Sequence, residues 1–230
     1  TLSSSSAASD VYKRQGSYDL HINEILSLKH VNSGIIRKKR FKIVVDGINS
    51  SGGIIIPKLL EALNVEVIKI NCIPDGNFAH DPEPLDKNLD QLKKEVLKSN
   101  SDLGIAVDPD VDRLVFVSEN GETISEENTL ISCADYILSR EKGSAVSNLS
   151  SSMGLRDVCK MHGVEYFSSM VGEINVVEKM KSVNAIIGGE GNGGIIYPES
   201  HYGRDALVGI GLLLTSVSYT HLTLPTKRIV

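Results

Sequence analysis

The sequence predicts an α/β protein built from two tandem, similar three-layer α/β domains with mixed, largely parallel sheets. Two observations support this fold class. From residue 41 the chain reads strand, small-residue turn, helix and strand, which is typical of the α/β unit of a parallel sheet. The same order of elements returns later, in a register that places Ser51 on Ser150 and Asn64 on Gly163. We interpret this repeat as a tandem duplication of one domain.

The first unit spans residues 41–118 and follows a helical lead-in at residues 16–40. "FKIVVD" is a short β-branched strand, and "IIIPKLLEALN" has helical spacing, with Asn64 where a left-handed helix end often falls. "VEVIKINC" supplies the next strand. Apolar side chains after Pro84 then predict an amphipathic helix, at Leu85, Leu89, Leu92 and Val96. "LGIAV-DPDVDR-LVFV" closes the unit as strand, polar loop and strand.

The second unit spans residues 119–216. Its helix at residues 130–138 has amphipathic spacing, and we expect it to correspond to the helix after Pro84. "SAVSNLSSSMGLRDVCKMHGVEYFSS" repeats strand, turn, helix and strand, and its turn serines are expected to cap the helix. "NAII-GGEGNGG-IIY" ends the unit. The two polar loops are therefore predicted to be equivalent hairpin tips, and loops on a rigid scaffold are where chemistry is usually placed.

Both ends of the chain differ from the part between them. Residues 5–15 read "SSAASDVYKRQ" and residues 217–226 read "VSYTHLTLPT". These strings resemble translations of one sequencing adapter and of its reverse complement. Segments that come from cloning are excluded from fold reasoning. We therefore expect residues 1–15 and 217–230 to be non-native tails, and the part between them to be a fragment of a longer protein.

Charge and composition exclude several classes of function. A net charge of −5 disfavours binding to nucleic acid or an anionic membrane, because either would need a basic face. The longest apolar run, residues 206–214, is much shorter than the roughly 20 residues of a membrane helix. The cysteines, at residues 72, 133 and 159, are widely separated, which favours reduced thiols over a disulfide or metal site. We expect a cytoplasmic protein without nucleic-acid or membrane partners.

"DPDVDR" places three carboxylates, Asp108, Asp110 and Asp112, in an otherwise apolar hairpin. Such close negative charges repel each other unless a cation compensates them. Pro109 favours a turn that could bring the oxygens together on one hard divalent cation, for which Mg²⁺ is the first candidate. Three alternatives remain: a solvated turn, an aspartate-nucleophile phosphatase and a Ca²⁺-binding module of the EF-hand type. Arg113 stands where an EF-hand requires glycine.

"GGEGNGG" formally matches a dinucleotide-binding pattern, but "IIYPES" follows it where that pattern requires a helix. Glu190 and Asn192 instead offer an acceptor and an amide that suit sugar hydroxyls. A flexible hairpin tip without a ligand is the alternative.

Arg113 and Arg204 are candidate phosphate ligands, or else ordinary salt-bridge residues. The histidines of the polar loops, His80 and His201, are interpreted as ordinary hydrogen-bonded side chains.

Taken together, "DPDVDR", "GGEGNGG", "PDGNFAHDPEP" and "VVDGINSSGG" resemble the α-D-phosphohexomutase superfamily, most closely its phosphoglucosamine mutase and phosphomannomutase-like members. The resemblance covers residues 41–215. It implies the second and third of four domains, in a parent enzyme that moves a phosphoryl group between the 1- and 6-positions of a sugar. The transfer would pass through a phosphoserine and a sugar bisphosphate. Mannose and glucose phosphates are alternatives to glucosamine phosphate.

The resemblance also implies roles for single residues. The three aspartates of "DPDVDR" would hold Mg²⁺, Arg113 would orient a phosphate, and Glu190 and Asn192 would contact sugar hydroxyls. Gly194 stands where many relatives have a histidine, so no general base is assigned. The phosphoserine loop of the first domain and the phosphate loop of the fourth have no counterpart in this chain, so the catalytic residue is unknown. We expect the chain to need both domains and to be inactive alone.

Overall fold

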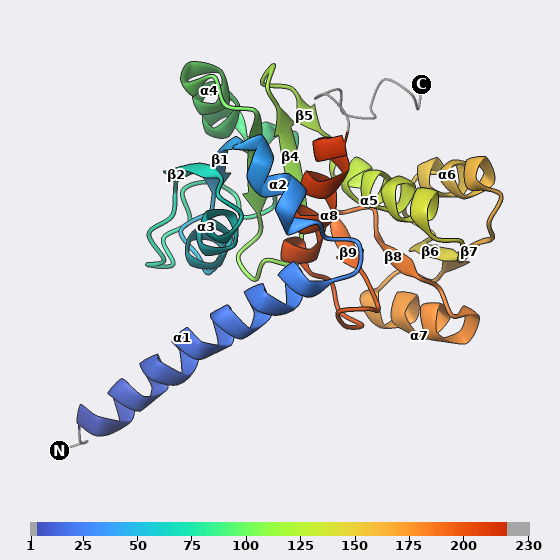
Figure 1. Ribbon diagram of the computed structural model, residues 1–230, viewed down its shortest axis with the longest axis horizontal. Helices are drawn as coiled ribbons and strands as arrows, with labels where there is room; N and C mark the ends of the chain where they lie inside the picture. The colour runs from blue at the N-terminus through green and yellow to red at the C-terminus, as the bar shows by residue number, and fades with distance from the viewer. Residues whose placement is uncertain (1–3, 220–230) are drawn as a thin grey trace.

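The computed structural model describes the backbone of residues 4–219 and the side chains of residues 16–219. Most of the second adapter-like segment, from residue 220, lies outside the described residues, as do the side chains of the first. Helix α1 (Ser4–Ser27) runs across the expected boundary at residue 16, and α8 (Ala206–Tyr219) runs across the one at residue 216. The N-terminal part of α1 points away from the rest of the molecule (Figure 1).

The first domain is a five-stranded mixed sheet in the order β2-β1-β3-β4-β5. Its strands are β1 (Lys42–Asp46), β2 (Glu66–Ile70), β3 (Leu103–Val107), β4 (Leu114–Ser118) and β5 (Thr123–Ile124). The pairs β1–β2 and β1–β3 are parallel, whereas β3–β4 and β4–β5 are antiparallel. Helices α3 (Gly52–Ala62) and α4 (Asp90–Ser99) cover opposite faces, because Ile43 and Val45 belong to the core on the α3 side and Val44 to that of α4.

The second domain repeats this arrangement in a four-stranded sheet of order β7-β6-β8-β9. Its strands are β6 (Ala145–Asn148), β7 (Tyr166–Ser169), β8 (Ile187–Glu190) and β9 (Gly194–Ile196). Helices α6 (Gly154–His162) and α7 (Glu173–Val183) lie on opposite faces (Figure 1). The parallel strands β7, β6 and β8 correspond to β2, β1 and β3, and the hairpin β8–β9 corresponds to β3–β4. The predicted fold class and duplication are confirmed.

One predicted correspondence is wrong. The helix that takes the place of α4 in the second domain is α7, which packs on β6 and β8 as α4 packs on β1 and β3. The helix expected in that role, α5 (Glu126–Arg140), contacts both β4 and β8 and therefore lies between the two sheets. Its middle is buried on every side, from Thr129 to Ala134. Hydrophobic spacing shows that a helix covers a sheet, but it does not show which sheet.

The helix predicted after Pro84 also begins later than expected. Leu85 is extended, a 3₁₀ turn η1 (Asp86–Asn88) follows, and α4 starts at Asp90. The predicted helix end at Asn64 is confirmed, because that residue has a left-handed backbone (φ 57°) directly after the last turn of α3.

The two domains share one hydrophobic core. A single cluster of buried residues runs from Ile43 in β1 through Ala134 in α5 to Ile187 in β8 and Leu212 in α8. Helix α2 (Ser33–Lys39) closes this core against α8.

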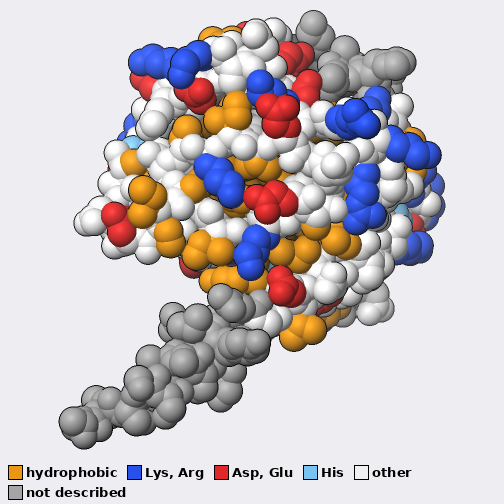
Figure 2. All heavy atoms as spheres, turned by 60° about the vertical axis from the view of Figure 1, so that its left-hand side comes forward, with side chains coloured by type: hydrophobic (Ala, Val, Ile, Leu, Met, Phe, Trp, Pro, Cys, Tyr) orange, Lys and Arg blue, Asp and Glu red, His pale blue; other side chains and the backbone are white. Residues whose placement is uncertain are grey.

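Among the described residues, no helix is both long and apolar enough to cross a membrane. Figure 2 shows one face of the molecule, on which basic and acidic side chains alternate over apolar surface.

A candidate active site where two hairpin tips meet

The first tip is the loop between β3 and β4. Strand β3 is buried along its whole length, and the chain turns at Asp108, whose carbonyl accepts a hydrogen bond from Val111 N at 3.2 Å. The Asp108 side chain holds the turn, because its Oδ1 accepts from the backbone N–H groups of Asp112 and Arg113, each at 3.0 Å. Val111 has φ 65°, a strained backbone for a β-branched residue. The hairpin predicted here is confirmed.

The three aspartates of this loop converge. Asp108, Asp110 and Asp112 each offer a carboxylate oxygen, and these oxygens lie within 4.8 Å of one another. Asp112 Oδ1 is buried and has no hydrogen-bond partner, so one acceptor in the cluster remains unsatisfied. Oxygen donors of this kind are those that Mg²⁺ prefers, and the residues therefore fit a divalent cation. The strands on either side of the loop argue against an EF-hand, whose loop joins two helices.

Burial and the neighbouring carboxylates change the pKa of one aspartate in this loop. Burial raises the pKa of the Asp108 carboxyl to about 7; the Arg113 backbone hydrogen bond opposes this, while neighbouring Asp112 and Asp110 increase it. The Arg113 guanidinium Nε lies 3.6 Å from Asp108 Oδ2. Arg113 Nη1 also donates to Glu83 at 3.0 Å. The Arg113 guanidinium is thus shared between this loop and Glu83, and by itself it only partly balances the negative charge of the three aspartates.

The second tip is the loop between β8 and β9. A strand, not a helix, follows its glycines, which excludes the dinucleotide-binding pattern as expected. Glu190 is 5% exposed, and both of its oxygens are engaged within the protein. Oε1 accepts from Asn148 Nδ2 at 2.7 Å and from Gly172 N at 3.3 Å, and Oε2 accepts from Arg204 Nη1 at 3.1 Å. Asn192 Oδ1 accepts from Gly194 N at 3.2 Å.

The two tips are in direct contact. Leu114 N donates to Gly193 O at 3.1 Å, and Arg113 pairs with Gly194 as an isolated antiparallel bridge. Gly193 has φ 91°, and a Cβ there would lie 2.6 Å from Leu114 O, so this approach requires glycine. A cavity of about 270 Å³ opens beside the contact, with lining residues that include Glu83, Arg113, Glu127, Ser150, Gly191 and Asn192.

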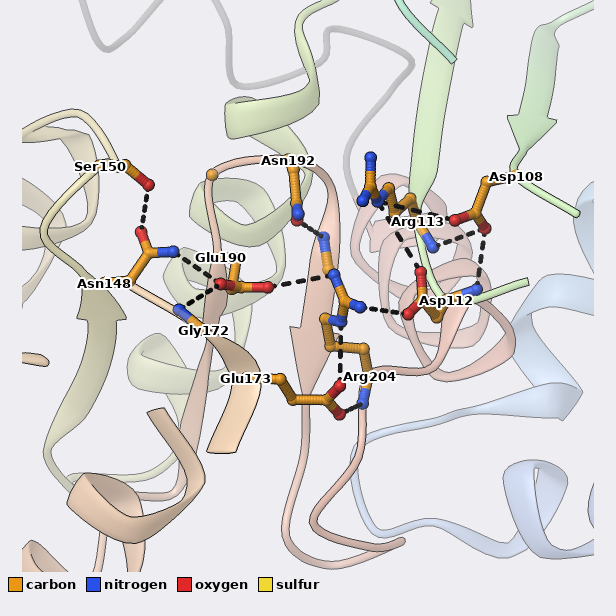
Figure 3. A network of polar contacts seen from close by, with 12 residues as sticks. Asp108, Asp112, Arg113, Asn148, Ser150, Gly172, Glu173, Glu190, Asn192 and Arg204 are labelled. Carbon is orange, nitrogen blue, oxygen red and sulfur yellow. Dashed lines mark hydrogen bonds and ion pairs between the residues drawn. The ribbon is translucent and has the colours of Figure 1, made fainter. Parts of the chain in front are cut away.

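Arg204 connects the tips through their side chains (Figure 3). Its guanidinium pairs with Asp112 of the first tip and with Glu190 of the second, the latter at 3.1 Å. Glu173, at the start of α7, accepts from Arg204 N at 3.0 Å and lies 3.4 Å from its Nε. Sequence reasoning placed Arg204 among the phosphate ligands, but in the structure its polar atoms face carboxylates of the protein.

The predicted capping by the serines of "NLSSSMG" is confirmed only in part. Met153, not a serine, is the N-cap of α6, but Ser152 Oγ accepts a hydrogen bond at 3.3 Å from the N–H of Gly154, the first residue of the helix. Ser150 and Ser151 instead donate to Asn148 Oδ1, at 3.0 and 2.7 Å, and Ser151 Oγ accepts from Gly191 N at 2.9 Å. These serines therefore support the second tip. Sequence reasoning missed this role, because the turn and the tip are about forty residues apart.

The first tip has matching support from the turn after β1. Ser50 and Ser51 each donate a hydrogen bond to Pro109 O at 2.8 Å. His80 is hydrogen-bonded as expected, with its Nε2 3.1 Å from Oδ2 of the buried Asp46. The sequence repeat aligns Ser51 with Ser150, and serines support both tips. This shared position in the sequence could have predicted the supporting role of the serines.

Two family models match the chain. The model described as phosphoglucomutase/phosphomannomutase, alpha/beta/alpha domain II matches residues 19–121, and the corresponding domain III model matches residues 125–227. A phosphoglucomutase/phosphomannomutase from Thermococcus kodakarensis is 39% identical over 173 residues, which are 74% of this chain and 38% of that protein. A Methanosarcina barkeri protein named "Probable phosphoglucosamine mutase" is 36% identical over 88% of this chain and 46% of its own length.

A crystal structure shows the same fold. A phosphoglucomutase/phosphomannomutase family protein from Burkholderia thailandensis superposes with a TM-score of 0.82 at 24% identity, covering 93% of this chain and 46% of that one. The chain thus spans less than half the length of the curated relatives described above.

Proposed function

The chain belongs to the phosphoglucomutase/phosphomannomutase family, and from this premise we propose that it forms the second and third domains of a phosphohexomutase. The proposed reaction moves a phosphoryl group between the 1- and 6-positions of a hexosamine phosphate, through a phosphoserine that lies outside this chain. Glucosamine phosphate is the first substrate to test, and mannose and glucose phosphates are the alternatives. Relatives with both kinds of name support testing all three substrates.

The contact between the two hairpin tips carries the proposal. A carboxylate cluster suited to a divalent cation lies at one tip, and a glycine-rich loop lies at the other. The hydrogen bond from Leu114 N to Gly193 O and the ion pairs of Arg204 join the two tips, and Arg113 of the first tip and Asn192 of the second line one cavity. A phosphate and the sugar that carries it are joined by one ester bond. Their two binding sites must therefore lie side by side, as these tips do.

The chain's own residues would bind and orient the reactants. Asp108, Asp110 and Asp112 would hold Mg²⁺, which when bound supplies positive charge against the negative charge that develops on a transferring phosphoryl group. Arg113 lines the cavity and would orient a phosphate through its guanidinium. Asn192 also lines the cavity, where its amide is available to sugar hydroxyls.

Glu190 and Arg204 need a further condition to act as substrate ligands. Their polar atoms are already paired with each other and with protein groups. We propose that a substrate hydroxyl or phosphate displaces part of this network when it binds. In that case Glu190 would exchange the Arg204 hydrogen bond for one from a sugar hydroxyl, while Asn148 keeps its place on Oε1.

The test compares the 230-residue chain with the full-length enzyme from the same source. With glucosamine phosphate, Mg²⁺ and a sugar bisphosphate, we expect turnover by the full-length enzyme and none by the chain alone. Replacing Asp110 by Asn in the full-length enzyme should abolish turnover while the protein stays folded. Turnover by the chain alone, or a full-length enzyme that accepts no hexose phosphate, would contradict the proposal. Phosphate found on Asp108 would indicate the phosphatase alternative instead.

A further inference from the structure

A second group of metal-binding side chains lies close to the aspartate loop, where α1 approaches α8. The Nε2 atoms of His21 and His201 lie 2.8 and 3.0 Å from the same oxygen, Oδ2 of Asp205. The three residues each offer a ligand atom within 4.8 Å of the others. His21 belongs to the lead-in helix, whereas the other two precede α8, so the group joins segments that are far apart in the chain.

The carboxylate of this group is fixed independently of the imidazoles. Asp205 Oδ1 accepts from the backbone N–H groups of Leu207 at 2.8 Å and Val208 at 3.4 Å, at the start of α8. That contact sets the orientation of the carboxyl group and leaves Oδ2 for the two histidines. Metal-binding carboxylates are commonly held through such hydrogen bonds, which place the ligand atom before the ion arrives.

The group is also open to solvent. A cavity of about 310 Å³ reaches it, with lining residues that include His21, Asp110, His201, Arg204 and Asp205. The side chains of His21 and His201 are 28% and 43% exposed, whereas that of Asp205 is 7% exposed. An ion could therefore enter and keep a water molecule on its open side, while the carboxylate stays buried beneath it.

An ordinary histidine–aspartate pair does not need a second imidazole. In the part of the chain that the structure describes, two other histidine–aspartate pairs have one imidazole each: His162 with Asp135 at 2.7 Å, and His80 with Asp46 at 3.1 Å. At Asp205, by contrast, two imidazoles point at one oxygen from opposite segments. Two imidazole nitrogens and one carboxylate oxygen are the ligands that Zn²⁺ takes in catalytic sites. An all-oxygen site such as the aspartate loop suits Mg²⁺ instead.

We propose that His21, His201 and Asp205 form a Zn²⁺ site that is separate from the Mg²⁺ site of the aspartate loop. Each imidazole would bind the ion through Nε2 in its Nδ1–H tautomer, and Asp205 would bind through Oδ2. The ion would link α1 to α8 beside the two hairpin tips. The inference rests on these three residues alone and does not depend on the proposed mutase activity.

The experiment titrates the metal-free 230-residue chain with Zn²⁺ in competition with a chromogenic chelator. The test variants are His21→Gln, His201→Gln and Asp205→Asn. Gln can still donate a hydrogen bond to Asp205, and Asn keeps the Oδ1 acceptor that caps α8, so the variants should fold. We expect each to weaken Zn²⁺ binding by at least about 10-fold. Circular dichroism checks the fold of every variant.

Two matched controls make the assignment specific. His162→Gln alters a histidine–aspartate pair of the same kind and should leave Zn²⁺ affinity unchanged. Asp110→Asn should weaken Mg²⁺ binding and leave Zn²⁺ binding largely intact. Co²⁺ in place of Zn²⁺ should give visible absorption without the charge-transfer band of a thiolate ligand. A thiolate band, a folded wild-type chain that binds no Zn²⁺, or unchanged affinity in the His21 and His201 variants would overturn the proposal.

Discussion

Arg204 joins carboxylates from three segments that are distant in the chain: Asp112, Glu173 and Glu190. Its side chain is only 14% exposed, and the side chains of Asp112 and Glu190 are 19% and 7% exposed. Charges in such surroundings are poorly solvated, so each carboxylate needs the guanidinium to stabilise its charge, and the guanidinium needs the carboxylates. A single guanidinium therefore connects acidic side chains of both hairpin tips.

We expect Arg204→Ala to lower the free energy of unfolding by about 3 kcal/mol, because it leaves two poorly solvated carboxylates unpaired. Urea denaturation followed by circular dichroism measures the loss. Arg156→Ala is the matched control, since Arg156 is 54% exposed and its nearest carboxylate oxygen, on Asp157, is 3.9 Å away. That change should cost less than about 1 kcal/mol. Equal losses in the two variants would show that the Arg204 network does not support the fold.

A second residue-scale prediction concerns Asp108, whose pKa is raised from 3.8 to about 7. Since the folded value lies above the unfolded one, the metal-free chain should lose stability as the pH rises from about 4 to about 7. Below about pH 7 a cation must also displace the proton. Calorimetry at pH 6 and pH 8 should therefore show Mg²⁺ binding about 10-fold weaker at the lower pH. Asp108→Asn should remove most of this pH dependence, and identical affinity at both pH values would contradict the assignment.

At the scale of the elements, the two hairpins are equivalent parts of a duplicated domain that have come to face each other. Each follows a buried parallel strand, β3 or β8, and each is supported by serines from the turn after the first strand of its own domain. The tips differ in what they carry, since one is acidic and the other rich in glycine. Duplication therefore supplied the scaffold twice, and the sequences of the tips made the two halves of the site different.

Gly193→Ala tests the contact between the hairpins. The new Cβ would meet Leu114 O at 2.6 Å on a backbone of φ 91°. We expect the free energy of unfolding to fall by about 2 kcal/mol or more, because the substitution strains the backbone and also displaces the neighbouring strand. Gly76→Ala is the control, because its φ of 77° is also left-handed but nothing lies within 4 Å of the added methyl group. It should cost only about 1 kcal/mol, and a Gly193 variant no less stable than the control would argue against a tight contact.

For the molecule as a whole, the shared core matters more than the division into two sheets. One hydrophobic cluster extends through both domains, and α5 packs against strands of each. Neither domain keeps its buried face covered if the other unfolds. The relative position of the two tips is therefore fixed by apolar packing behind the site as well as by the contacts within it.

We accordingly expect the two domains to unfold in one cooperative transition. Urea denaturation followed by far-ultraviolet circular dichroism should coincide with that followed by tyrosine fluorescence, because Tyr136 and Tyr197 are buried in the shared core. Mg²⁺ should shift both curves by the same amount, since a ligand of the folded state stabilises the whole cooperative unit. Two separated transitions would show that the domains are independent.

The sequence by itself determined the fold class, the duplication and the chemistry of each tip. Strand and helix periods are local properties, and the aspartates of "DPDVDR" and the glycines of "GGEGNGG" are adjacent in the chain. Only the tertiary structure decided that α5 lies between the sheets, that Arg204 links Asp112 to Glu190, and that His21 meets Asp205. These contacts join residues from different elements, and most of them are far apart in the chain. Their distances are set by the packing of helices against sheets. No local pattern of residues shows which helix face will pack against which sheet.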